Sequence, residues 1–175
     1  MFLRRILFAF AAFAWPSAAQ AGEIFGGVLA HDVETRLTRG GFEGGADFQL
    51  GWRGGRIAAL KAIGAPAPYA FGSLNSQGDT NFAAAGLSWR VGGRLYLRPG
   101  LGIAIHDRDS HIVRPDGFRG DLGSRILFEP ELGIGYQLND RVSIEASWVH
   151  ISQAQLFSDQ NPGMDSIGIR LNHRL

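Results

Sequence analysis

The sequence predicts an all-β protein, an eight-stranded antiparallel transmembrane β-barrel. Segments of alternating polar and apolar residues recur along the chain, and such alternation is typical of strands with two different faces. The connections alternate between tight turns and long polar loops, as they do in outer-membrane barrels. Beyond the N-terminus no apolar run approaches the length of about 18 residues that a membrane-spanning helix needs.

Residues 1–21 are expected to be a signal peptide that is removed on export. A basic start at Arg4 and Arg5 precedes an apolar run over 6–15, and Ala19-Gln20-Ala21 supplies small residues for cleavage. The protein is therefore expected in the outer membrane of a bacterial cell.

The remaining residues, 22–175, form one expected domain, the barrel. Two of the 17 basic residues and none of the 16 acidic residues lie in the signal segment, so the rest of the chain carries a formal charge of −1. A general nucleic-acid partner is not expected at this charge. The chain has no cysteine, which excludes thiol catalysis and cysteine-ligated metals.

The eight strands are expected where alternation is clearest. Their ranges are 23–31, 44–53, 67–76, 81–91, 93–106, 124–138, 141–152 and 165–174. Residues 55–64 remain open as a strand, a strand extension or a short helical turn.

The connections between these strands predict their orientation. Residues 90–93 and 138–141 are short and carry Gly, Asn and Asp, which hairpin turns favour. Residues 107–123 and 153–164 are long and polar, and 74–80 is interpreted as an outer turn. With both termini in the periplasm, the tight turns fall inside and the long loops outside.

The two faces of the strands differ in polarity. In the seventh expected strand the even positions are apolar and the odd positions are polar, and the sixth places Glu129 and Glu131 opposite its apolar side chains. Bulky charges of both signs favour a polar, ion-paired lumen with lipid against the apolar face; a soluble β-barrel or sandwich is the alternative. We expect these two carboxylates to pair with Arg98 or Arg125.

Three residues suited to acyl transfer fall on the apolar side. His150 and Ser152 continue the even parity of their strand, with Cα atoms about 6.6 Å apart, and Asp165 opens the next strand on the same side. We therefore expect one lipid-exposed patch with Ser152 as nucleophile, His150 as general base and Asp165 orienting the imidazole. Gln153 and Ala154, through backbone N–H groups or the Gln153 side chain, are candidates for an oxyanion site.

A histidine or serine at a strand end is often only interfacial polarity, so this pattern alone leaves catalysis and structure open. His31 and His173 are interpreted as interfacial. The segment His106-Asp107-Arg108-Asp109-Ser110-His111 suits a metal site or a solvated loop, and its spacing favours the loop.

Several stretches resemble the lipid A 3-O-deacylase (PagL-type) outer-membrane family. They are the His-x-Ser stretch at 150–156 and the Asn-Pro-Gly-Met-Asp stretch at 161–165, with supporting segments at 122–129 and 100–103. The resemblance extends over about 95–175. Gln153 stands where the family usually has Asn, and Asp165 stands where the best-known form has Glu.

The resemblance implies a carboxylic-ester hydrolase that removes the 3-O-linked acyl chain from lipid A, the membrane anchor of lipopolysaccharide. It implies a triad of Ser152, His150 and Asp165, with no cofactor and no metal. Lipid A and the outer membrane are the expected partners, and a homodimer is left open. The alternatives are a non-catalytic small barrel with a structural or adhesive role, and phospholipid ester hydrolysis by the same triad.

Overall fold

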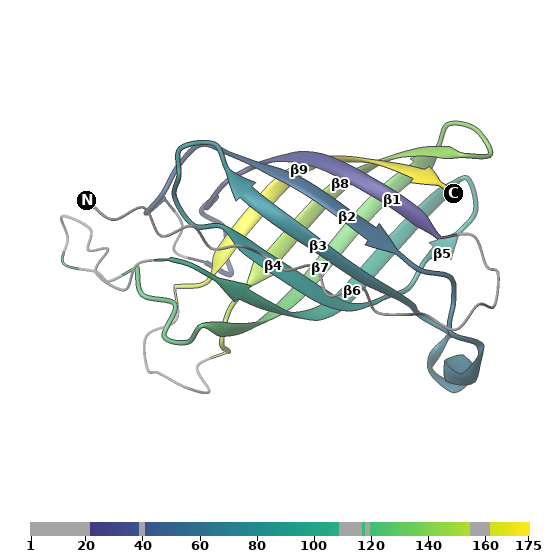
Figure 1. Ribbon diagram of the computed structural model, residues 1–175, viewed down its shortest axis with the longest axis horizontal. Coiled ribbons are helices and arrows are strands. Elements are labelled where there is room, and N and C mark those ends of the chain that lie inside the picture. Colours follow the sequence, from purple (N-terminus) through teal and green to yellow (C-terminus); the bar gives the residue numbers. More distant parts are fainter. Residues whose placement is uncertain (1–21, 39–40, 109–116, 118–119, 155–161) are drawn as a thin grey trace.

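The computed structural model describes residues 22–38, 41–108, 117, 120–154 and 162–175. Eight long antiparallel strands close into a barrel (Figure 1). They are β1 (Glu23–Ala30), β2 (Ala46–Arg53), β3 (Ala67–Asn75), β4 (Phe82–Ser88), β6 (Leu95–His106), β7 (Ile126–Gln137), β8 (Val142–Ile151) and β9 (Met164–Arg174). The barrel closes where β1 pairs with β9, so the predicted fold class is confirmed. A two-residue strand, β5 (Val91–Gly92), pairs only with β6.

The two ends of the barrel differ as the sequence predicts. The C-terminus, β5 and the β7–β8 turn lie at one end, and the β3–β4 turn and the described parts of the long connections lie at the other (Figure 1). The β7–β8 turn is tight because Asn139 Oδ1 accepts the backbone N–H groups of Arg141 and Val142, each at 2.9 Å. We call the end with the long connections the outer end.

The open segment after β2 is a short helical turn. A 3₁₀ helix, η1 (Ala58–Ile63), ends at Gly64, whose φ of 92° lies in the left-handed region. Trp89 donates its indole N–H to the carbonyl of Ile63 at 2.7 Å, which ties η1 to the end of β4. Among the described residues no helix has the length and apolar character needed to cross a bilayer.

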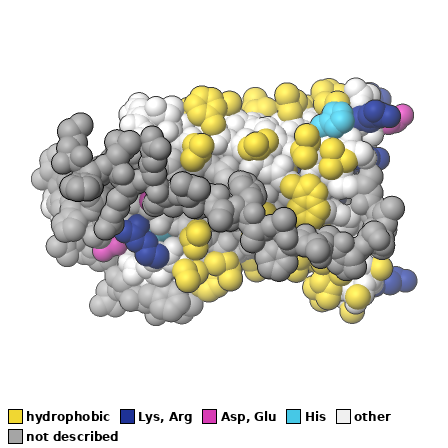
Figure 2. All heavy atoms as spheres, in the orientation of Figure 1, with side chains coloured by type: hydrophobic (Ala, Val, Ile, Leu, Met, Phe, Trp, Pro, Cys, Tyr) yellow, Lys and Arg dark blue, Asp and Glu magenta, His cyan; other side chains and the backbone are white. Residues whose placement is uncertain are grey.

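Alternation along each strand separates an outer apolar face from an inner polar face. Leu50 of β2 is 72% exposed, whereas its neighbour Gln49 is 4% exposed. In β8 the side chains of Ser143, Glu145 and Ser147 are buried inside, as predicted. Hydrophobic side chains are spread along the visible wall, and charged side chains lie toward its two ends (Figure 2).

The lumen contains the expected ion pairs, but the expected partners are wrong. Glu131 pairs with Arg170 at 2.6 Å, and Arg98 pairs with Glu145 at 2.8 Å. Arg125 instead donates to backbone carbonyls of the outer connection. Because the lumen is narrow, long side chains reach strands that are not their neighbours, and adjacency in the sequence does not reveal these pairs.

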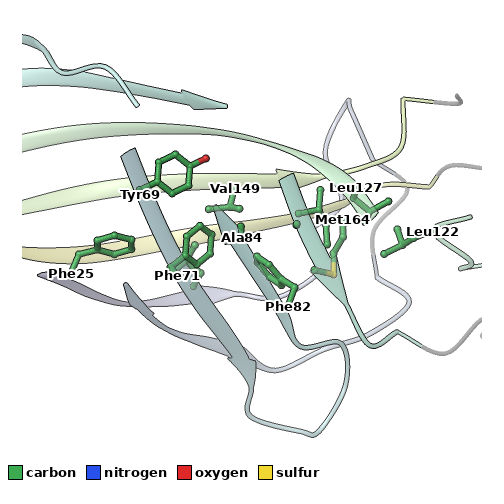
Figure 3. Close-up of a cluster of buried hydrophobic side chains, with 12 residues drawn as sticks. Phe25, Tyr69, Phe71, Phe82, Ala84, Leu122, Leu127, Val149 and Met164 are labelled. Carbon is green, nitrogen blue, oxygen red and sulfur yellow. The ribbon is translucent and has the colours of Figure 1, made fainter. Parts of the chain in front are cut away.

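The lumen also contains a cluster of buried apolar side chains, which the sequence did not predict. Buried hydrophobic side chains from several strands point toward one another inside the barrel (Figure 3). Val149 and Ile151, each 1% exposed, belong to this cluster. The wall behind the outer end of β8 is therefore packed rather than water-filled.

Candidate active site

His150 and Asp165 meet across two neighbouring strands. They are direct partners in the β8–β9 ladder, and His150 Nδ1 lies 2.7 Å from Asp165 Oδ1. An ionised carboxylate can only accept a hydrogen bond, so Nδ1 carries the proton and donates it in this contact, and the other ring nitrogen, Nε2, is left as an acceptor. This is the tautomer that a general base needs.

On its other side β8 pairs with β7, and the hydrogen-bond ladder between these two strands is interrupted beside His150. Backbone hydrogen bonds join Ser152 and Phe128 in both directions, at 2.8 and 3.0 Å. In this register Pro130 lies opposite His150, and proline has no N–H to give to the ladder. The β7–β8 ladder resumes at Glu131 and Val149, so the site lies at a local break in the sheet.

Asp165 receives further hydrogen bonds from the connection between β1 and β2. Its Oδ2 accepts from the Thr35 hydroxyl at 2.5 Å and from the Thr38 hydroxyl at 3.2 Å. The backbone N–H of Val33 donates to the Asp165 carbonyl at 2.8 Å. Neither threonine could be identified from the sequence, because nothing in a polar loop reveals which strand it will pack against.

The His150 ring is held from two further sides. Trp148, two residues earlier on the same face, stacks on it with ring centroids 5.8 Å apart and planes 25° apart. A Cβ atom at Gly163 would lie 3.0 Å from His150 Cε1, so only glycine leaves the ring its place. Gly163 also has a φ of 65°, a conformation that other residues rarely adopt.

Ser152 follows His150 on the same side of the chain. Among the described residues, no hydrogen bond joins Ser152 Oγ to His150. Gln153 is fully buried, and Ala154 has a left-handed backbone with φ of 52°. The structure thus brings His150 and Asp165 together. Ser152 follows His150 by two residues, and the backbone turns directly after Gln153.

The expected lipid exposure of this patch is wrong. His150 and Ser152 are each 8% exposed, and Asp165 is fully buried. The parity was predicted correctly, but Thr35 and Thr38, from the connection that follows β1, contact the Asp165 carboxylate. A strand's alternation gives the direction of a side chain and says nothing of what covers it.

Of the other four histidines, His31 and His106 have polar contacts within the fold. His106 Nε2 lies 2.7 Å from the Ser124 carbonyl oxygen, and His111 lies outside the described residues. In the part of the chain that the structure describes, no group of three or more metal-ligating side chains is found. His173 is exposed on the outer face. His31 is not interfacial as expected; it is buried at the outer end of the lumen.

His31 belongs to a buried ionic cluster. Its ring nitrogens lie 2.7 Å from Asp47 and 3.0 Å from Glu43, and Arg108 contacts both Asp32 and Glu43. Burial alone would lower the pKa of His31, but the hydrogen bonds to Asp47 and Glu43 raise it to about 9. Burial alone would raise the pKa of Glu43, but His31 and Arg108 lower it to about 2. Burial raises the pKa of Asp32.

Comparisons with known proteins agree with this architecture. The sequence profile of the lipid A 3-O-deacylase (PagL) family matches residues 40–174. The crystal structure of the outer membrane enzyme PagL is similar, with a TM-score of 0.62 and 17% identity over 87% of this chain and 99% of that chain. Neisserial surface protein A (NspA) has a TM-score of 0.51 and 12% identity over 90% and 100%. No curated protein matches the chain by sequence.

Proposed function

The chain belongs to the lipid A 3-O-deacylase (PagL) family, and we propose that it removes the 3-O-linked acyl chain of lipid A with Ser152, His150 and Asp165. The family match and the outer-membrane barrel fold support the deacylase activity. One observation supports the residues: a buried carboxylate, Asp165, holds Nδ1 of His150 at 2.7 Å, and a serine follows two positions along the chain.

In the proposed reaction Ser152 Oγ adds to the carbonyl carbon of the ester while its proton passes to His150 Nε2. The tetrahedral intermediate collapses, the bond from the acyl carbon to the sugar 3-oxygen breaks, and His150 returns the proton to that oxygen. A water molecule then attacks the acyl-serine with His150 again as base, which releases the fatty acid and restores Ser152. Asp165 stays ionised and stabilises the imidazolium.

The direction of the site favours a lipid substrate over a soluble one. His150, Ser152 and Asp165 lie on the lipid-side parity of β8 and β9 and at the outer end of the barrel. In the outer membrane this position corresponds to the boundary between headgroups and acyl chains, where the esters of lipid A lie. A site inside the barrel would instead face the apolar cluster that packs the lumen.

The oxyanion site is a further part of the proposal. We assign it to the backbone N–H groups of Gln153 and Ala154, because the left-handed turn at Ala154 redirects the chain just after the nucleophile. The Gln153 side chain stands where the family usually has Asn. Reverting it with Gln153→Asn tests whether a shorter amide changes turnover.

Export and assembly also remain proposals. Residues 1–21 lie outside the described residues, and N-terminal sequencing of the membrane-inserted protein tests their removal. A homodimer is a hypothesis that sedimentation of the purified protein in detergent tests.

The deciding experiment is mass spectrometry of lipid A from cells that express the wild type or Ser152→Ala. We expect the wild type alone to remove one hydroxyacyl mass. Ser147→Ala, the same change on the lumen side of β8, is the matched control and should keep activity. Heat-modifiable gel mobility establishes that each variant is folded. Unchanged lipid A with a folded wild type would contradict the proposal, and loss of acyl chains from phospholipids instead would change the substrate.

A further inference from the structure

Residues 33–38, which we call the strap, lie beside the start of β9. The strap contacts Asp165 three times: through the Val33 backbone N–H at 2.8 Å, the Thr35 hydroxyl at 2.5 Å and the Thr38 hydroxyl at 3.2 Å. The carboxylate is fully buried, and its other oxygen faces His150. The two carboxylate oxygens therefore have separate partners, one in the barrel and one in the strap.

The Thr35 hydroxyl is oriented toward Asp165. Its oxygen accepts the backbone N–H of Leu37 at 3.0 Å, so its single proton remains for the carboxylate. Thr38 is the weaker donor, because its hydroxyl also lies 3.2 Å from the Val33 carbonyl oxygen. Hydrogen bonds to an ionised acceptor are among the stronger ones in proteins.

Four buried charged side chains hold the two ends of the connection between β1 and β2, which contains the strap. These are His31, Asp32, Glu43 and Arg108. Asp32 Oδ2 accepts the backbone N–H groups of Phe42 and Glu43 at 2.9 and 3.0 Å, which joins the start of the connection to its end. The strap is consequently anchored in the barrel independently of its contacts with Asp165.

We infer that Thr35, supported by Thr38, is a positioning residue for the deacylation reaction: it fixes the Asp165 carboxylate so that Oδ1 stays aligned with His150. This inference rests on the proposed function. Without the Thr35 hydroxyl, Oδ2 would be buried with only the weaker donor. A carboxylate that lacks donors rotates or draws in water, and either change moves the acceptor away from the imidazole.

The test compares Thr35→Val with Thr35→Ser. Valine keeps the shape of the side chain and removes the hydroxyl, whereas serine keeps the hydroxyl. With purified lipid A in detergent micelles as substrate, we expect Thr35→Val to lower kcat by about 10- to 100-fold with little change in KM. Thr35→Ser should stay within about threefold of the wild type, since the donor is retained. Leu37→Ala, at a 67% exposed position of the strap, is the control for general disturbance.

Repeating the substitution in a variant without the Asp165 carboxylate separates an effect on the position of that carboxylate from a general effect on stability. In Asp165→Ala, where no carboxylate is left to position, adding Thr35→Val should change the residual rate by less than about twofold. Equal losses in both backgrounds would overturn the inference, as would a Thr35→Val variant with wild-type kcat. If Thr35→Val does not fold, Thr38→Val serves in its place, with a smaller expected loss of about three- to tenfold in kcat; an unchanged kcat would overturn the inference.

The outcomes also distinguish this inference from the proposed function. Activity in the wild type and its loss in Ser152→Ala support the function whatever Thr35 does. An active wild type with an unaffected Thr35→Val overturns the inference alone. A folded but inactive wild type overturns both.

Discussion

Replacing Gly163 with alanine tests the geometry around His150 without touching any polar group. The new Cβ would lie 3.0 Å from His150 Cε1 and 2.9 Å from Thr38 Cγ2. Carbon atoms prefer separations of about 3.5 to 4.0 Å, so the ring, the strap or both must move by about 0.5 Å or more. Alanine at the left-handed φ of 65° adds a backbone cost of about 1 kcal/mol.

A shift of this size should act on turnover more than on stability. A misplacement of about 1 Å in a catalytic group costs about 100-fold in rate, so we expect Gly163→Ala to lower kcat by about 10- to 100-fold. The loss should appear mainly in kcat, because the new Cβ would also lie 3.7 Å from His150 Nε2, the atom proposed to take the proton. The folded state should lose only about 1 to 2 kcal/mol.

The assay measures initial rates of lipid A deacylation in micelles, with heat-modifiable mobility as the test of folding. Gly78→Ala is the matched control, because Gly78 also has a left-handed φ, 83°, and a Cβ there meets nothing within 4 Å. This control carries the backbone cost without the clash. Wild-type turnover in a folded Gly163→Ala would refute the reasoning that His150 must keep its present position.

Two further predictions concern stability, measured by urea unfolding in lipid vesicles with tryptophan fluorescence. Asp47 and Glu43 raise the pKa of His31 from 6.5 to about 9. The protonated His31 therefore contributes about 3 kcal/mol to the free energy of unfolding below pH 6.5, and this contribution is lost as pH rises through about 9. His31→Gln should remove this pH dependence, and equal pH dependence in both proteins would contradict the prediction. Arg170→Met should destabilise the barrel by about 3 kcal/mol, because Glu131 loses its 2.6 Å partner while buried; a change below about 1 kcal/mol would show that the pair contributes little.

The barrel could be predicted because its signals are local and periodic. Alternation in β8 placed Glu145 inside and Ile144 outside, and the side chains of the tight turn at 138–141 identified its end of the barrel. The bilayer enforces this pattern along every strand, since an outward polar side chain has no water to contact. One strand's sequence is enough to read it.

The contacts between distant segments could not be predicted in this way. The partners of Glu131 depend on the shear and width of the closed barrel, which no single strand encodes. The position of the strap depends on the left-handed backbone at Asp32, φ 48°, and on the buried charge of Arg108. Each of these is a single residue within a polar loop, where the sequence has no alternation of polar and apolar residues from which its role could be predicted.

The burial of His150, Ser152 and Asp165, which were expected to be exposed to lipid, and the presence of the strap have the same physical cause. A carboxylate on the lipid side of a barrel wall has neither water nor lumenal arginines to stabilise it, and burying an unpaired charge is costly. Donors must therefore come from another part of the chain, and the connection that follows β1 supplies them through Thr35 and Thr38. Excluding water from the pair also strengthens the hydrogen bond between Asp165 and His150. Any barrel with a carboxylate–histidine pair facing lipid needs comparable hydrogen-bond donors. These donors should be sought in the loops beside the strand that carries the carboxylate.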